Sequence, residues 1–91
     1  MKSYKIFLHR KAERDVQRLP NKVLNRFEEL MADLHIDPVP WEKWDLKYMV
    51  NLDDTYRVRI GDYHVVYWVN TDLHEIVILR VARRESVYDS D

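Results

Sequence analysis

The sequence of 91 residues contains no cysteine and only one glycine. Without cysteine the chain can form neither a disulfide framework nor a thiolate metal site, and this composition suits a reducing compartment. The single glycine, Gly61, excludes a glycine-rich loop that wraps a phosphate. No apolar run approaches the roughly 18 residues that a membrane span needs, and the N-terminal residues become polar too soon for a signal peptide. We therefore expect a cytoplasmic protein without a membrane segment.

The charges of the chain are nearly balanced overall but segregated along it. The formal net charge is −1, yet it is +6 over residues 1–26, −6 over residues 27–54 and −1 over residues 55–91. Proteins that bind nucleic acids without sequence preference are usually basic overall. Any contact of this chain with RNA must therefore come from a local basic patch. The length fits one domain over residues 1–91.

Two helices are expected after a short N-terminal strand over residues 3–8, where apolar and polar side chains alternate. Ala12, Val16 and Leu19 then recur at helical spacing until Pro20 ends a first helix. Asn21 is a suitable N-cap for a second helix. The apolar stripe of this second helix consists of Val23, Phe27, Leu30, Met31 and Leu34. The two helices form a hairpin whose apolar stripe needs a sheet to cover it.

The strongest strand signal lies in residues 56–69, which predict a β-hairpin. Apolar residues alternate with two arginines in its first half, so one face is apolar and the other is basic. Gly61-Asp62 is a two-residue hairpin loop signal. Such a loop sets Arg59 directly opposite His64 on the neighbouring strand.

Two further strands complete the expected sheet. Residues 75–81 are apolar on both faces, which predicts an interior strand, and residues 46–50 are compatible with a short strand. We therefore predict an α+β fold in the order β-α-α-β-β-β. Its antiparallel sheet has three to four strands plus the N-terminal strand, and a two-helix hairpin covers one face.

The second face of the predicted hairpin gathers Arg57, Arg59 and His64. Cations that are cross-strand neighbours repel one another unless an anion lies between them, so the cluster suggests a phosphate or carboxylate ligand. An ordinary solvated face explains the two arginines about equally well, and a lone histidine is more often a surface residue than a catalytic one. The tryptophans fit core and rim packing, although Trp68 would border the cluster if it shares the face of His64.

Two stretches resemble the RelE/ParE toxin superfamily and are nearest to its RelE branch. They are residues 56–67, YRVRIGDYHVVY, and residues 78–88, ILRVARRESVY. The resemblance covers the whole chain and implies a RelE-like toxin of a type II toxin–antitoxin system. Such a toxin cleaves messenger RNA in the ribosomal decoding site without a metal or cofactor. The 2′-hydroxyl of the RNA attacks the adjacent phosphate, so the toxin is an endoribonuclease that inhibits translation.

The resemblance assigns catalytic roles to five positions of this sequence: Arg57, Arg59, His64, Arg84 and Tyr88. Two further basic residues are expected to contact RNA: Lys47 and Arg83. The sequence departs from the family pattern at His64, where the family usually has arginine, and at Ala82 and Arg83, where the family has glycine and histidine.

The chemistry of these residue types divides the expected roles. Arginine holds phosphate oxygens bidentately but does not deprotonate in proteins, so Arg57, Arg59 and Arg84 would clamp the phosphate. We expect the like charge of Arg59 to lower the pKa of His64, which would then be a neutral general base near pH 7. Tyr88 could be an acid, a base or a stacking partner for a base, or it could simply cover the sheet edge.

Three functions remain open at this point. The first is the messenger-RNA endoribonuclease, with a cognate antitoxin and the translating ribosome as partners and a hetero-oligomeric toxin–antitoxin complex. The second is a ParE-like toxin that poisons DNA gyrase by protein–protein contact. The third is a degenerate toxin that acts only as an antitoxin-binding module, which the histidine at position 64 and the near-neutral charge favour modestly.

Overall fold

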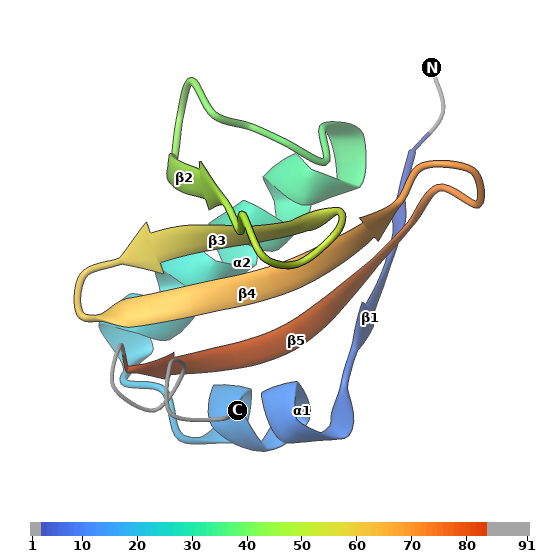
Figure 1. Ribbon diagram of the computed structural model, residues 1–91. Helices are drawn as coiled ribbons and strands as arrows, with labels where there is room; N and C mark the ends of the chain where they lie inside the picture. Colours follow the sequence, from blue (N-terminus) through green and yellow to red (C-terminus); the bar gives the residue numbers. More distant parts are fainter. Residues whose placement is uncertain (1–2, 84–91) are drawn as a thin grey trace.

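The computed structural model describes residues 3–83 and shows an α+β fold (Figure 1). The elements are β1 (Lys5–Leu8), α1 (Arg10–Gln17), α2 (Asn21–Ile36), β2 (Asp45–Tyr48), β3 (Thr55–Ile60), β4 (Tyr63–Asn70) and β5 (Glu75–Arg83). The five strands lie in the order β1-β5-β4-β3-β2. β1 pairs with β5 in parallel, and the other neighbouring pairs are antiparallel. The predicted fold class is confirmed. Neither helix of this part of the chain is long and apolar enough to cross a membrane.

The β3–β4 hairpin has the predicted register. Arg59 is the Cα partner of His64, so the loop between the strands is Gly61-Asp62. Gly61 has a φ of 58°, in the left-handed region where a glycine carries no steric penalty. β5 lies between β1 and β4, which confirms the interior position that its apolar residues predicted. The hairpin therefore lies inside the sheet, with β2 paired to β3 on one side and β5 paired to β4 on the other.

The hydrophobic core lies between the sheet and α2, which crosses behind the strands in Figure 1. The predicted stripe of α2 supplies three buried residues, Phe27, Leu30 and Leu34. The strands face them with Val58, Ile60, Val65, Tyr67, Val69, Ile76, Ile78 and Val81. The N-cap prediction for α2 was wrong by one residue: Pro20 occupies the cap and Asn21 is already helical. The proline ring fixes φ near −60°, and an extended ψ of 151° then starts the helix directly after it.

An ion pair joins α1 to β5 across most of the sequence. Nε of Arg80 donates to Oδ2 of Asp15 at 2.8 Å, and Nη2 of Arg80 donates to Oδ1 at 3.3 Å. The backbone N–H of Val81 donates to the same Oδ2 at 2.8 Å. Both side chains are largely buried, and the hydrogen bonds with Asp15 raise the pKa of the Arg80 guanidinium. The carboxylate of Asp15 thus fixes α1 against the sheet.

The connection between α2 and β2 is also held by polar contacts. The indole N–H of Trp44 donates to Oδ2 of Asp33 at 2.7 Å, and Lys43 forms an ion pair with the same oxygen at 3.1 Å. The hydroxyl of Tyr67 on β4 donates to the carbonyl of Pro38 at 2.8 Å. These contacts determine where β2 begins, and β2 carries two charged residues of the site described below.

The carboxylate of Asp33 should make the stability of the protein pH-dependent. The hydrogen bond from Trp44, followed by that from Lys43, lowers the pKa of Asp33 below its ordinary value of 3.8. A depressed folded-state pKa adds stability above the unfolded-state value, and that stability is lost as the pH falls through the folded-state pKa. We expect Asp33→Asn to lower the free energy of unfolding by about 1 kcal/mol at pH 7. The deficit should shrink towards pH 3 in urea titrations followed by tryptophan fluorescence, and an equal deficit at both pH values would contradict this role.

Candidate functional site

The polar residues of the site lie in two rows across the face of the sheet that α2 leaves open. One row consists of successive Cα partners on β2 to β5: Asp45, Arg59, His64 and Ala82. The next row consists of Lys47, Arg57, Val66 and Arg80. Alternation along each strand turns these side chains away from the core face. The sheet therefore brings together Arg57, Arg59 and His64, as the sequence predicted, and it also places Lys47 opposite Arg57.

An acidic residue of β2 neutralises part of this cluster. Oδ2 of Asp45 lies 2.7 Å from Nη2 of Arg59, and Oδ1 lies 3.7 Å from Nη2 of Arg57. The inference that the clustered cations require an external anion was therefore incomplete, because the protein supplies a carboxylate between them. With one negative and three positive side chains in β2 and β3, the two rows remain basic there.

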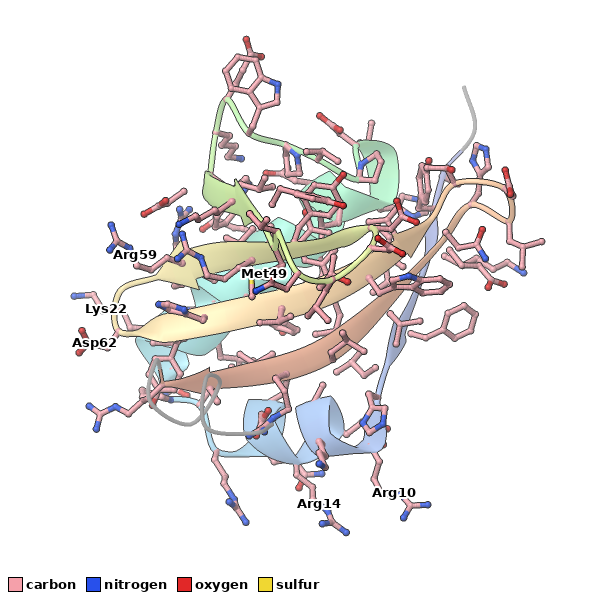
Figure 2. The ribbon with its side chains drawn as sticks, viewed as in Figure 1. Arg10, Arg14, Lys22, Met49, Arg59 and Asp62 are labelled. Carbon is pink, nitrogen blue, oxygen red and sulfur yellow. The ribbon has the colours of Figure 1, made fainter. Side chains whose placement is uncertain are left out.

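The members of the cluster differ in their access to solvent. The side chain of Arg59 is 57% exposed, whereas that of Arg57 is 14% exposed. Figure 2 shows Arg59 extending from the end of β3 beside the hairpin turn. His64 is buried, with an exposure of 3%, so the alternative that it is an ordinary surface histidine is wrong. Arg59 can therefore contact a ligand directly, whereas Arg57 and His64 are less accessible to solvent.

The remaining predicted site residues fall in different places. Lys47 is exposed, and its Cα partner on the neighbouring strand β3 is Arg57. Arg83 is the last residue of β5 and is the Cα partner of Tyr63, which puts it in a row of the core face rather than beside Arg59. Arg84 and Tyr88 lie outside the described residues. The roles predicted for these four residues stay predictions.

Trp68 and Arg80 border the cluster on the same face. Trp68 is partly buried and follows His64 and Val66 in the alternation of β4. Arg80 lies two strands from Arg57 in the same row, but its charge is already paired with Asp15. Arg80 therefore adds little to the positive potential of the face.

One hollow among the described residues lies away from these two rows. It has a volume of about 240 Å³ and is lined by Asp33, Ile36, Asp37, Pro40, Trp41, Glu42 and Lys43. Within residues 3–83, no group of three or more histidine, aspartate or glutamate side chains could hold a metal ion. None of the clustered residues Lys47, Arg57, Arg59 and His64 lines this hollow.

Sequence reasoning missed two acidic residues that control this face. Asp45 is the first residue of β2 and precedes the strand expected over residues 46–50, and Asp15 is not among the predicted site residues. A signal for Asp15 exists, because an acidic residue near the C-terminal end of a helix opposes the helix dipole. Its presence there indicates a partner elsewhere in the fold.

Comparisons with known proteins agree with the resemblance seen in the sequence. A family model described as the ParE toxin of the type II toxin–antitoxin system parDE matches residues 6–88. The chain is 38% identical over 85 residues to a Methanocaldococcus jannaschii protein designated RelE1, covering 93% of this chain and 94% of that protein. It is 30% identical over 90 residues to toxin RelE of Mycobacterium tuberculosis, covering 93% of this chain and 86% of that protein.

A solved structure has a similar fold. The archaeal RelE–RelB complex from Pyrococcus horikoshii contains a chain with a TM-score of 0.81 and 36% sequence identity. The match covers 90% of this chain and 96% of that chain. The order of helices and strands described above is therefore that of a RelE protein.

Proposed function

This chain belongs to the ParE/RelE family of toxins from type II toxin–antitoxin systems, and we propose that it is a ribosome-dependent messenger-RNA endoribonuclease. The observation that carries the proposal is the basic face of the sheet, where Arg59 is the cross-strand partner of buried His64 and Arg57 and Lys47 lie in the next row. RNA carries its phosphates in a row along the backbone, and the basic face of a sheet can bind several of them without an enclosed pocket.

The residues of this face suit cleavage by the 2′-hydroxyl of the RNA. That reaction requires stabilisation of the charge that develops on the phosphate, together with proton transfer from the attacking oxygen and to the leaving oxygen. The exposed guanidinium of Arg59 would hold phosphate oxygens, and Arg57 would contribute charge from below. His64 would accept the proton of the 2′-hydroxyl. Arg84 and Tyr88 would complete the site, as the family resemblance implies.

The protein partners follow from the same family. The Pyrococcus horikoshii relative was solved as a complex of RelE with RelB, so we propose that a RelB-like antitoxin binds this chain and blocks the basic face. The ribosome would present the messenger RNA. We propose that the protein acts in the cytoplasm, where both partners reside.

A second function is favoured by one specific observation. The matching family model is described as ParE rather than RelE, which keeps gyrase poisoning as the alternative. That activity would depend on a protein–protein contact and would not require proton transfer by His64. The two functions therefore predict different molecular damage in cells.

The deciding experiment is induction of the chain in cells, followed by primer extension on an abundant transcript. In-frame cuts within translated codons are expected, and they should disappear from the same transcript when its start codon is removed. Growth arrest with intact messages and DNA-damage signalling would instead establish gyrase poisoning. The absence of both effects would leave only the antitoxin-binding module.

Substitution of His64 tests its role as the general base. We expect His64→Gln, which keeps a polar side chain of similar size, to lower the cleavage rate about 100-fold, at the low end of the usual contribution of acid–base catalysis. His64→Arg should lower it as well, although it restores the residue usual in the family. Cleavage by His64→Arg at or above the parent rate, measured on ribosome-bound message, would show that the site needs charge at this position.

A further inference from the structure

The carboxylate of Asp45 contacts the guanidinium of Arg59, the group that would hold a phosphate in the proposed site. Its Oδ2 lies 2.7 Å from Nη2 of Arg59, and its other oxygen reaches towards Arg57 at 3.7 Å. A carboxylate and a phosphate offer a guanidinium the same kind of paired oxygens. Building on the proposed function, we propose that Asp45 is an internal competitor of the RNA phosphate, which sets the affinity of the site for RNA.

The exposure of the partners indicates that this ion pair can open. The side chains of Asp45 and Arg59 are 47% and 57% exposed, and exposed ion pairs contribute only about 0–1 kcal/mol. Asp45 also lies on β2, a four-residue strand at the edge of the sheet. An RNA phosphate can therefore replace the carboxylate on Arg59 without disturbing the core. Arg57 is 14% exposed and would keep its place during the exchange.

The displaced carboxylate continues to act on the bound RNA. It remains beside the site because rotation of the Asp45 side chain alone is enough to leave Arg59, and it repels the phosphate that has taken its place. Both effects weaken the binding of RNA from free solution. RNA held next to the toxin on a ribosome has a high effective concentration and overcomes this penalty. Asp45 would thus direct the toxin away from free RNA and towards RNA that a larger assembly presents.

Binding of a fluorescent single-stranded oligoribonucleotide, with 2′-O-methyl groups to prevent cleavage, tests the proposal. We expect Asp45→Asn to bind about three- to tenfold more tightly than the parent at low salt. The slope of log K against log salt should steepen by roughly 0.7, because one more cation becomes available to neutralise a phosphate. Asp45→Glu, which keeps the carboxylate, should bind like the parent.

Two controls make the outcomes distinct. Asp72→Asn changes the net charge equally but lies in the turn between β4 and β5, at the other end of the hairpin strands, and should bind like the parent. Arg59→Ala should weaken binding. Unchanged or weaker binding by Asp45→Asn, with weakened binding by Arg59→Ala, would overturn the role of Asp45 alone. Equal binding by the parent and Arg59→Ala would instead overturn the proposed RNA site. If Asp45→Asn does not fold, Asp45→Ser serves as the second variant with the same expectations.

Discussion

We expect cleavage of ribosome-bound messenger RNA to fall by at least about 1,000-fold when Arg57 and Arg59 are both replaced by alanine. Removal of one group that stabilises the charge of a transition state typically costs 100- to 1,000-fold in rate. The two arginines lie in adjacent rows on β3 and approach the same carboxylate, so a phosphate in that place would contact both. Single-turnover cleavage on a stalled ribosome measures the loss, since slow binding or product release does not limit that rate.

The matched control removes the same charge from another part of the surface. Arg10 and Arg14 lie on α1 and point away from the sheet at the bottom of Figure 2, whereas Arg59 lies at the left edge of that view. The double substitution of these two residues by alanine should leave the cleavage rate within a few fold of the parent. A comparable loss in both double variants would mean that overall charge, rather than the site on β3, drives cleavage.

Replacement of Asp15 by alanine should lower the free energy of unfolding by about 2–4 kcal/mol. The change removes both acceptors of Arg80 and the acceptor of the Val81 N–H at once. Breaking a buried pair on one side leaves the other charge without compensation, and the partial exposure of Arg80 moderates this cost. For a domain of this size the loss is a large share of the total stability. The melting temperature should drop by about 10–20 °C.

Three variants separate the ion pair from a general effect of losing an acidic residue. Asp15→Asn keeps one acceptor and should lose less stability than Asp15→Ala, when both are measured by urea denaturation. Asp62→Ala removes an exposed carboxylate in the hairpin turn and should be nearly neutral. An Arg80→Met change in the Asp15→Ala background should recover part of the loss, because it removes the unpaired charge. If stability does not recover, the loss in Asp15→Ala comes from α1 itself and not from the ion pair with Arg80.

The sequence predicted the face of the sheet well, because that prediction needed only local rules. The alternation of Arg57 and Arg59 with apolar residues decides which side chains share a face, and Gly61-Asp62 decides the register. With these two rules Arg59 and His64 are neighbours. Two features remained beyond them: the direction of β1 relative to β5, and the burial of His64.

The acidic partners could not be predicted because they depend on distant parts of the chain. Arg80 and Asp15 are separated by 65 positions, and no local pattern sets that distance. Asp45 contacts Arg59 only because β2 pairs with β3 after an irregular connection. The strand expected over residues 46–50 begins one residue too late, so it does not include Asp45. Alternation predicts the side of a sheet on which a residue lies, whereas its ion-pair partner depends on the complete fold.

The parallel pairing of β1 with β5 has a consequence for the order in which the protein folds. Lys5 pairs with Glu75, so the first strand has no neighbour in the sheet until the last strand is synthesised. The β3–β4 hairpin has contacts between residues close in sequence and can form early, but contacts between distant residues form slowly. During synthesis, β1 and α1 therefore lack their partner β5 until the end of the chain has been made. The β3–β4 hairpin, which carries Arg57 and Arg59, can therefore form before the sheet of which it is part is complete.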